Sequence, residues 1–103
     1  MVVKAYMADP LVHGLGTPRL ATEATAAIEW TQAHAADLRL PLLLFHGSAD
    51  KLVPPQGSRT FFEKVAAADR KRIEYPGGYH ESFNDLHREQ ALDDVEQWLE
   101  QHL

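Results

Sequence analysis

The 103-residue chain has no cysteine, which excludes disulfide frameworks, thiolate metal sites and a cysteine nucleophile. It also lacks a long hydrophobic stretch: the strongest uninterrupted apolar run, Leu42–Phe45, is far too short to cross a bilayer. Basic residues are scarce, with 10 Lys and Arg against 15 Asp and Glu, and they form no basic stripe. We therefore expect no nucleic-acid partner. The N-terminal residues Met1–Lys4 carry no secretory pattern, so the expected location is cytoplasmic.

The remaining composition is that of an ordinary globular protein. Apolar residues make up 45% of the chain and charged residues 24%, which argues against disorder. By length alone, 103 residues form one small domain or part of a larger one.

The N-terminal third predicts a loop followed by a helix. The first 16 residues are expected to be irregular, because Asp9-Pro10 restricts the backbone to extended or turn geometry. Thr17 and Pro18 are a good helix start, with threonine as the N-cap and proline at the first helical position. We place this helix from about Pro18 to about Ala36. Its expected apolar face consists of Leu20, Ala24, Ala27, Ile28, Thr31 and Ala35.

The middle of the chain predicts a strand, a helix and a second strand. Leu42–Phe45 is apolar at consecutive positions, which is typical of a central parallel strand covered on both faces. Prolines 54 and 55 open a helix of roughly Gln56–Ala68. Arg72–Tyr75 is the second strand, ended by a Pro-Gly-Gly turn. The expected buried side of the helix is Phe61, Phe62, Val65 and Ala66.

The last predicted helix begins between Asp85 and Glu89 and completes an α/β pattern of helix, strand, helix, strand, helix. The strand-helix-strand part is a parallel βαβ unit. Its central strand needs neighbours on both edges, and the chain offers one, so the pattern indicates a larger sheet than these residues contain. The apolar stripe of the last helix is Leu92, Val95, Leu99 and Leu103.

Two polar segments follow the two strands, His46–Asp50 and Gly77–Glu81. Catalytic groups of α/β folds gather at the carboxyl ends of parallel strands, and adjacent strand ends lie about 5 Å apart. Loops of this length can bring the Asp50 carboxylate to the His80 imidazole. In such a pair the carboxylate fixes the imidazole tautomer and leaves the other ring nitrogen free as a base. The plainer alternatives are a turn aspartate and a loop histidine.

The residues around both segments resemble a known family. Pro41–Pro54 is similar to the strand and acid turn of α/β-hydrolases, with the pattern proline, hydrophobic run, G-x-x-D, then valine and proline. Arg72–Glu81 resembles the last strand and histidine loop of that fold. Asp9–Val12 and the glutamate after the histidine resemble the monoacylglycerol lipase and lysophospholipase-like branch, which is grouped with the serine aminopeptidases. The resemblance covers nearly the whole chain, from Tyr6 to Leu103.

The resemblance implies a Ser-His-Asp hydrolase of carboxylic esters, with Asp50 as triad acid and His80 as triad base. No serine of the chain lies in a G-x-S-x-G motif, and the family's early oxyanion-hole loop is also absent. The chain thus matches the C-terminal part of the fold. Residues 1–36 correspond to the end of the lid region with a helix, and residues 37–103 to the C-terminal βαβα portion of the core. The implied substrates are monoacylglycerol- or lysophospholipid-like esters, and the chain alone is expected to be inactive.

Other residues of the two segments are expected to support the site. His46 is expected to be structural, and Glu81 and Asn84 to brace the histidine loop or to cap the last helix. No metal is expected, because His80-Glu81 begins an H-E-x-x-H motif that has asparagine in place of the second histidine. No cofactor is expected either, since the chain lacks a G-x-G-x-x-G dinucleotide motif and no helix directly follows Gly77-Gly78 to bind a phosphate.

A second hypothesis comes from a different class of protein. The chain can also be read as a non-catalytic α/β module that self-associates by pairing sheet edges between copies. The reason is that the Leu42–Phe45 strand needs a second neighbour.

Overall fold

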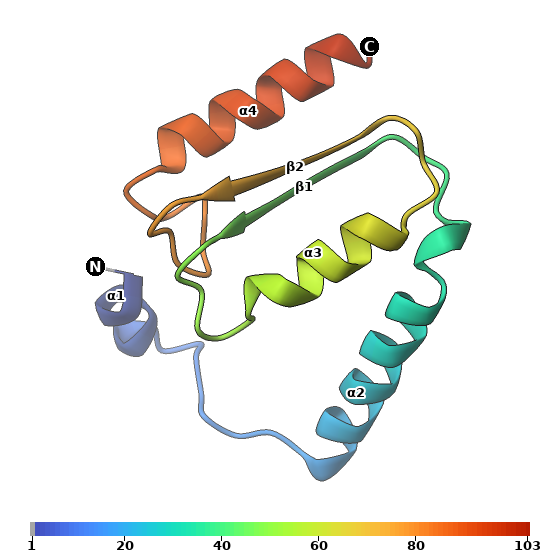
Figure 1. Ribbon diagram of the computed structural model, residues 1–103. Coiled ribbons are helices and arrows are strands. Elements are labelled where there is room, and N and C mark those ends of the chain that lie inside the picture. Colours follow the sequence, from blue (N-terminus) through green and yellow to red (C-terminus); the bar gives the residue numbers. More distant parts are fainter. Residues whose placement is uncertain (1) are drawn as a thin grey trace.

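The computed structural model describes residues 2–103 as four α-helices, one 3₁₀-helix and two strands (Figure 1). In chain order these are α1 (Val2–Ala8), α2 (Pro18–Ala33), η1 (Ala35–Asp37), β1 (Leu42–Gly47), α3 (Pro55–Lys64), β2 (Arg70–Tyr75) and α4 (Arg88–Gln101). The predicted order of helix, strand, helix, strand and helix is confirmed for α2 to α4.

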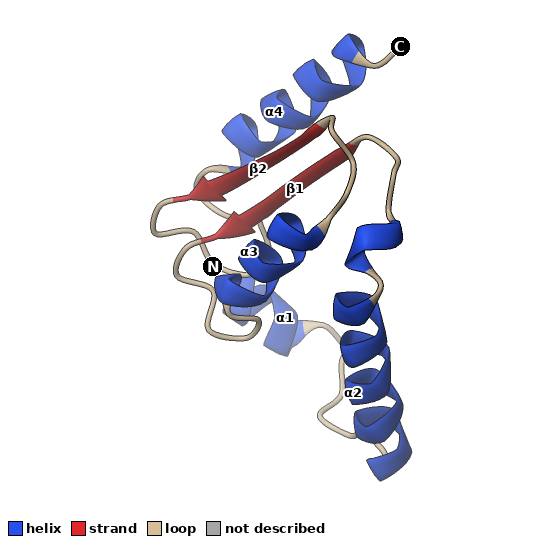
Figure 2. Cartoon of the chain, turned by 45° about the vertical axis from the view of Figure 1, so that its right-hand side comes forward, coloured by secondary structure: helices blue, strands red, loops and turns tan. Residues whose placement is uncertain are grey.

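Strands β1 and β2 form a parallel pair in which Leu42 is opposite Arg70 and Gly47 is opposite Tyr75. Helix α3 connects the two strands and lies on one side of the sheet, while α4 lies on the other side (Figures 1 and 2). The predicted parallel βαβ unit is therefore confirmed. The carboxyl ends of both strands lie at the same end of the sheet, so the segments that follow Gly47 and Tyr75 begin next to each other.

The start of α2 agrees with the sequence pattern. The Thr17 hydroxyl accepts a hydrogen bond from the Leu20 N–H at 3.1 Å, and Pro18 occupies the first turn. The helix ends at Ala33, slightly before the expected Ala36, and the chain continues as the short η1. The 3₁₀ turn directs Ala35 into the interior, where it is 1% exposed.

Helix α3 is shorter than predicted and ends at Lys64, because Val65 has an extended backbone with φ −64° and ψ 130°. Beyond the helix the helical period no longer decides which residues are buried. Val65 and Ala67 are buried, whereas Ala66, which was expected on the buried side, is exposed. The expectation for Ala66 was wrong because successive side chains of an extended segment point to opposite faces, so Ala66 points away from the face of Val65 and Ala67.

The expectation of an irregular N-terminus was wrong for residues 2–8, which form α1, and is confirmed for residues 9–16, which form no helix or strand. The Asp9-Pro10 pair sets the end of this helix, since the residue before a proline disfavours the helical conformation. The Asp9 carboxylate accepts a hydrogen bond from the Leu11 N–H at 2.9 Å and closes a turn after the helix.

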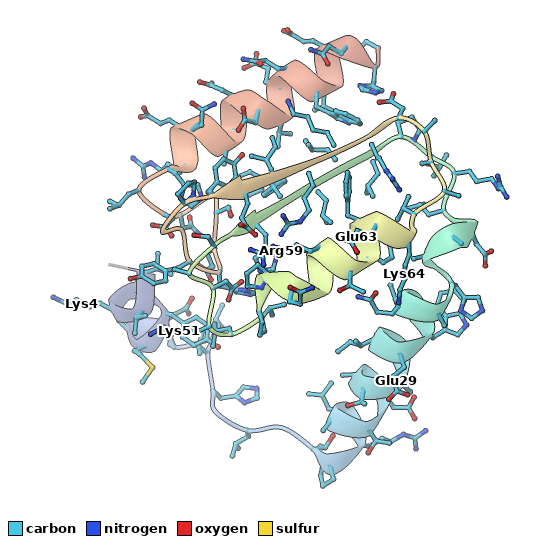
Figure 3. All side chains as sticks on the ribbon, in the orientation of Figure 1. Lys4, Glu29, Lys51, Arg59, Glu63 and Lys64 are labelled. Carbon is cyan, nitrogen blue, oxygen red and sulfur yellow. The ribbon has the colours of Figure 1, made fainter. Side chains whose placement is uncertain are left out.

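The apolar helix faces are largely uncovered. Leu20 and Ile28 of α2 are each 63% exposed, and Leu92 and Leu99 of α4 are 53% and 55% exposed. Figure 3 shows the side chains of α2, including Glu29, standing free around most of the helix, whereas side chains of α3 and α4 fill the space on either side of the strands. The predicted apolar face of α2 is therefore largely exposed, and of its residues only Ala35, which lies beyond the helix in η1, is buried.

The buried interior is small. Its main cluster consists of Ala35, Val65 and Ala67, with the partly buried Leu38, Leu42 and Phe61 packed around them, while Tyr75 and Ala91 are buried outside this cluster. This cluster joins η1, the end of α3 and the start of β1. It lies at the end of the strands that is opposite to the two polar segments. Within residues 2–103, no helix is both long and apolar enough to traverse a membrane.

His102 attaches the end of α4 to the segment before β2. Its Nδ1 contacts the Trp98 carbonyl oxygen at 2.7 Å, and its Nε2 contacts the Asp69 carboxylate. The Trp98 carbonyl and then Asp69 raise the pKa of His102, because a charged imidazolium can donate to both oxygen atoms.

We expect this contact to stabilise the fold only while His102 is protonated. A group with a raised folded-state pKa contributes its full stability below the unfolded pKa, about 6.5 for histidine, and loses it as pH rises through the folded pKa. The difference in free energy of unfolding between wild type and His102→Gln should therefore be largest at acidic pH and shrink on the alkaline side. Urea titrations across pH measure it. Asp69→Asn should reduce the difference, and a pH-independent difference would contradict the assignment.

Candidate active site

The turn after β1 holds the Asp50 carboxylate in a fixed orientation. Asp50 follows Gly47 by three residues, and its side chain is only 2% exposed. Its Oδ1 accepts hydrogen bonds from the backbone N–H groups of Leu52 and Val53, both at 2.9 Å. Such side-chain-to-backbone bonds are typical of an aspartate that closes a turn. Asp50 thus has the turn geometry of the plainer alternative, while its second oxygen remains available to other donors.

The loop after β2 presents His80 beside this turn. Gly77 has a positive φ of 71°, a conformation that glycine adopts without steric cost. Further along, the Tyr79 N–H donates to Asp85 Oδ2 at 2.7 Å, which closes the segment between the two residues. The hydrogen bonds from the N–H groups of Tyr79 and Leu86 hold the pKa of Asp85 below its usual range. An ionised Asp85 is thus part of the loop that carries His80.

Three hydrogen bonds join the acid turn to the histidine loop. The Ser48 N–H donates to the Tyr75 carbonyl at 2.9 Å, and the Ala49 N–H donates to the Gly78 carbonyl at 2.8 Å. In the other direction, the Gly77 N–H donates to the Ser48 hydroxyl at 2.7 Å. The two backbones approach so closely that a Cβ on Gly47 would lie 2.3 Å from the Tyr79 carbonyl oxygen. The position of His80 relative to Asp50 is therefore set mainly by main-chain contacts.

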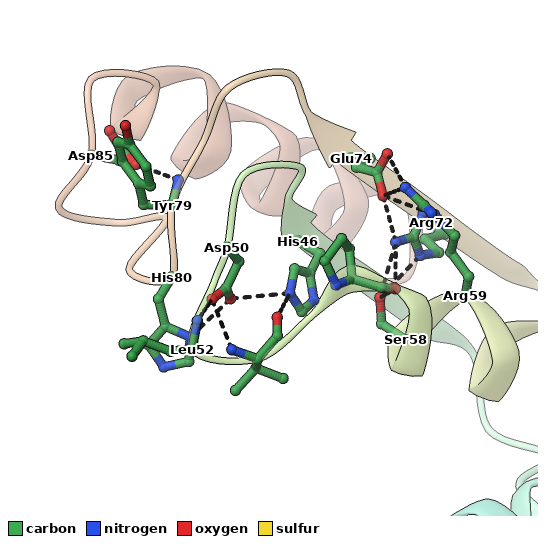
Figure 4. Close-up of polar contacts among 12 residues, drawn as sticks. His46, Asp50, Leu52, Ser58, Arg59, Arg72, Glu74, Tyr79, His80 and Asp85 are labelled. Carbon is green, nitrogen blue, oxygen red and sulfur yellow. Dashed lines mark hydrogen bonds and ion pairs between the residues drawn. The ribbon is translucent and has the colours of Figure 1, made fainter.

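Asp50 and His80 are in direct contact, as Figure 4 shows. His80 Nδ1 lies 2.9 Å from Asp50 Oδ2. Burial alone would raise the pKa of Asp50, but hydrogen bonds from Val53, His80 and Leu52 outweigh it and lower the pKa, so the carboxylate is ionised. An ionised carboxylate only accepts hydrogen bonds, so Nδ1 carries the proton. The sequence predicted this contact, and the catalytic roles of the two residues stay a prediction.

His46 also contacts the acid, which the sequence pattern did not reveal. Its Nε2 lies 2.8 Å from the Val53 carbonyl oxygen and 3.0 Å from Asp50 Oδ2. The side chain projects from the end of β1 and is 13% exposed (Figure 4). The spacing of four residues between His46 and Asp50 was the available signal, but it is informative only once the turn between them is known.

Glu81 and Asn84 contact each other rather than the last helix. The Asn84 side-chain amide donates to Glu81 Oε2 at 3.1 Å, so the pair does brace the loop after His80. The residue before α4 is His87, which makes no capping hydrogen bond through its side chain. The alternative expectation that Glu81 or Asn84 caps α4 was therefore wrong.

A cavity of about 480 Å³ adjoins the His80–Asp50 pair and is lined by Phe45, Val53, Ser82 and Phe83 as well as both site residues. The His80 side chain is 46% exposed, so its ring is accessible from solvent. In the part of the chain that the structure describes, His80 Nε2 has no hydrogen-bond partner, and no three histidine or acidic side chains converge as metal ligands.

Polar contacts lie on both faces of β2 behind the site, and no pattern in the sequence predicted them. The Tyr75 hydroxyl at the end of β2 donates to Asp94 Oδ2 of α4 at 2.7 Å. Burial, and then this carboxylate, raise the pKa of Tyr75. On the opposite face, Arg59 and Arg72 both donate to the Glu74 carboxylate and hold its pKa below the usual range (Figure 4). These contacts fix α4 and α3 to β2, the strand that leads to His80.

Comparisons with known proteins find a consistent set of relatives. The family described as "Serine aminopeptidase, S33" matches residues 1–87. A monoacylglycerol lipase of Mycolicibacterium smegmatis is 42% identical over 103 residues, which cover 99% of this chain and 37% of that protein. The monoglyceride lipase of Mus musculus is 31% identical, over 94% of this chain and 33% of that protein.

The structure of one relative is also similar. The crystal structure of Paleococcus ferrophilus monoacylglycerol lipase matches with a TM-score of 0.93 at 35% identity, covering 99% of this chain and 40% of that chain. This chain thus spans well under half the length of the relatives it matches. The family match and this likeness agree with the fold class predicted from the two strands and their turns. The chain belongs to the serine aminopeptidase S33 family and has the fold of an α/β-hydrolase.

Proposed function

We propose that this chain supplies the acid and the base of a serine carboxylic-ester hydrolase, with Asp50 as the acid and His80 as the base. The observation that carries the proposal is the contact between His80 Nδ1 and the buried, ionised Asp50 at 2.9 Å. The serine nucleophile would be contributed by sequence outside these 103 residues, which contain no G-x-S-x-G motif. The chain is then the C-terminal segment of the intact enzyme.

In the proposed reaction, His80 Nε2 removes the proton of the serine hydroxyl as the oxygen attacks the ester carbonyl. The resulting imidazolium is stabilised by the Asp50 carboxylate, which already accepts the Nδ1 proton. His80 then donates the proton from Nε2 to the leaving alcohol, and water hydrolyses the acyl-enzyme by the same route. The imidazole is suited to both steps because one nitrogen is held by Asp50 and the other is free.

The substrate class is supported by an apolar hollow beside His80. It has a volume of about 720 Å³, and its apolar lining includes Val2, Val3 and Tyr6 of α1 together with Leu52 and Leu86. A fatty acyl chain of a monoacylglycerol- or lysophospholipid-like ester would bury its methylene groups on such a surface.

We also propose that residues 1–36, which include α1 at this hollow, belong to the end of a lid region, and that residues 37–103 belong to the catalytic core.

A chimeric enzyme tests the proposal. The segment of the Mycolicibacterium smegmatis monoacylglycerol lipase that aligns with this chain is replaced by residues 1–103, which is reasonable at 42% identity. We expect this chimera to release fatty acid from a monoacylglycerol, and replacement of His80 by Gln to abolish the release. A chimera that folds, as judged by cooperative unfolding, but has no esterase activity would refute the proposal.

The isolated 103-residue chain is expected not to react with a fluorophosphonate probe, which labels activated serine nucleophiles. The reason is that neither Ser48 nor Ser58 nor Ser82 lies in a nucleophile elbow. The Ser48 hydroxyl in addition accepts the Gly77 N–H within the joined turns. Labelling is measured by in-gel fluorescence, with the intact bacterial relative as the positive control. Stoichiometric labelling of the isolated chain would contradict the assignment of the nucleophile to another segment.

One observation favours the second candidate function, a module that self-associates through sheet edges. Within residues 2–103 the sheet consists of β1 and β2 only, so each strand has one edge without a strand neighbour. This candidate predicts concentration-dependent dimers in sedimentation equilibrium that a proline at an edge position of β1 would abolish. A monomer at all concentrations would eliminate it.

A further inference from the structure

The Asp50 carboxylate is enclosed by donors on both of its oxygen atoms. Oδ1 accepts the N–H groups of Leu52 and Val53. Oδ2 is contacted by two imidazole nitrogens, His80 Nδ1 at 2.9 Å and His46 Nε2 at 3.0 Å. Three of these contacts are hydrogen bonds, from Leu52, Val53 and His80. The fourth is a close approach of His46, whose Nε2 makes its hydrogen bond with the Val53 carbonyl oxygen.

The protonation of His46 follows from its neighbours. Its Nε2 faces the Val53 carbonyl oxygen and Asp50 Oδ2, and neither group can donate a hydrogen bond while Asp50 is ionised. An unprotonated Nε2 would face two acceptors with no shared proton. Nε2 therefore carries a hydrogen, which it donates to the Val53 carbonyl oxygen, while Asp50 Oδ2 lies 3.0 Å from the same nitrogen.

The two histidines differ in how firmly they are held. His46 projects from β1 and its side chain is 13% exposed, whereas His80 lies in a loop and its side chain is 46% exposed. The carboxylate can rotate about its Cβ–Cγ bond unless both oxygen atoms are fixed. The turn fixes Oδ1, and His46, attached to β1, borders Oδ2 and fixes the turn through the Val53 carbonyl oxygen.

We infer that His46 is a positioning residue that holds the Asp50 turn, through its hydrogen bond to the Val53 carbonyl oxygen and its close approach to Oδ2, so that Oδ2 receives the Nδ1 proton of His80. His46 does not exchange a proton with substrate. It acts through Asp50, by keeping His80 in the tautomer whose Nε2 is free. The catalytic consequence of this inference rests on the proposed function. The geometry that it describes can be measured independently of any enzymatic activity.

The first test is made on the isolated chain by nitrogen-15 NMR of the histidine side chains. The nitrogen-15 shifts of the neutral rings report which of the two ring nitrogens carries the proton. We expect the proton of His46 on Nε2 and that of His80 on Nδ1. Finding the proton of His46 on Nδ1 would overturn the inference, because that tautomer cannot donate from Nε2 to the Val53 carbonyl oxygen.

A matched pair of variants isolates the donor. His46→Gln keeps an N–H group within reach of Asp50, and His46→Met has a similar length and flexibility but no such group. We expect His80 to stay mainly in the Nδ1–H tautomer in the glutamine variant and to lose that preference in the methionine variant. Equal spectra for both variants would overturn the inference. His34→Gln, at a histidine whose ring hydrogen-bonds to and stacks on Trp30, is the control and should leave the His80 signals unchanged.

The same pair in the chimera tests the consequence for catalysis. His46→Met is expected to lower kcat on the order of 10- to 100-fold, since small displacements of catalytic groups have effects of this size, and to leave KM unchanged. His46→Gln should restore most of the loss. An unchanged kcat in the methionine variant would overturn the inference. A chimera without activity, together with the expected NMR result, would instead refute the proposed function and leave the positioning of Asp50 by His46 intact.

Discussion

Replacing Asp50 by asparagine in the chimera should lower kcat by about 10⁴-fold, the size of effect known when a triad carboxylate becomes an amide. The amide oxygen of asparagine would keep the hydrogen bonds from Leu52 and Val53. The amide NH₂ group would then face His80 Nδ1 and donate to it. His80 would be held as the Nε2–H tautomer, which cannot accept the serine proton. Steady-state hydrolysis of a monoacylglycerol measures the change, and KM should alter little.

Asp94→Asn is the matched control for this substitution. It makes the same chemical change at a carboxylate that accepts a hydrogen bond from Tyr75 and does not contact His80. We expect its kcat to remain close to that of the unsubstituted chimera. If Asp50→Asn kept most of the activity, or if Asp94→Asn lost as much as Asp50→Asn, the role of Asp50 as triad acid would have to be abandoned.

Gly47→Ala should separate the acid turn from the histidine loop. The added Cβ would lie 2.3 Å from the Tyr79 carbonyl oxygen and 2.4 Å from that of Gly78, and backbone atoms cannot be moved aside like the end of a side chain. We expect the free energy of unfolding to fall by about 1–3 kcal/mol, the typical cost of overpacking. The contact between Asp50 and His80 should be lost, and with it the activity of the chimera. Urea unfolding and monoacylglycerol hydrolysis measure the two effects.

The control for this prediction is Gly57→Ala, which makes the same change in α3, where an added Cβ meets no atom within 4 Å. Alanine is favoured over glycine in a helix by roughly 0.5–1 kcal/mol, so this variant should be neutral or slightly more stable. The changes in the free energy of unfolding caused by the two substitutions should thus have opposite signs or clearly different sizes. Equal effects on stability and activity would show that the close approach at Gly47 is not important.

The fold class could be predicted because Leu42–Phe45 is apolar at consecutive positions, which is typical of a parallel strand, and because turn residues follow this short run. The start of β2 could not, because it begins with Arg70 and Lys71, two charged residues that do not resemble a strand in the sequence. The exposed face of α2 was missed for a different reason. A sequence shows that Leu20 and Ile28 share a face, but not whether a partner for that face lies in the same chain.

The candidate site could be predicted only as far as strand order determines it. Asp50 and His80 follow adjacent parallel strands, so their contact follows from topology and the short turns. The contacts of His46 and of Asp85 depend on how each loop folds back on itself. Contacts of this kind join residues four to seven positions apart without a regular period, and no pattern in the sequence distinguishes them from chance spacings.

The central claim, that His80 is the base of a serine hydrolase and is held by Asp50, is tested most directly by fluorophosphonate labelling of the chimera. The probe reacts with a serine only when a neighbouring base activates it. We predict rapid labelling of the chimera that contains residues 1–103, and loss of labelling when His80 is replaced by Gln in a protein that unfolds at the same urea concentration. Labelling of the His80→Gln chimera at the unsubstituted rate would contradict the claim.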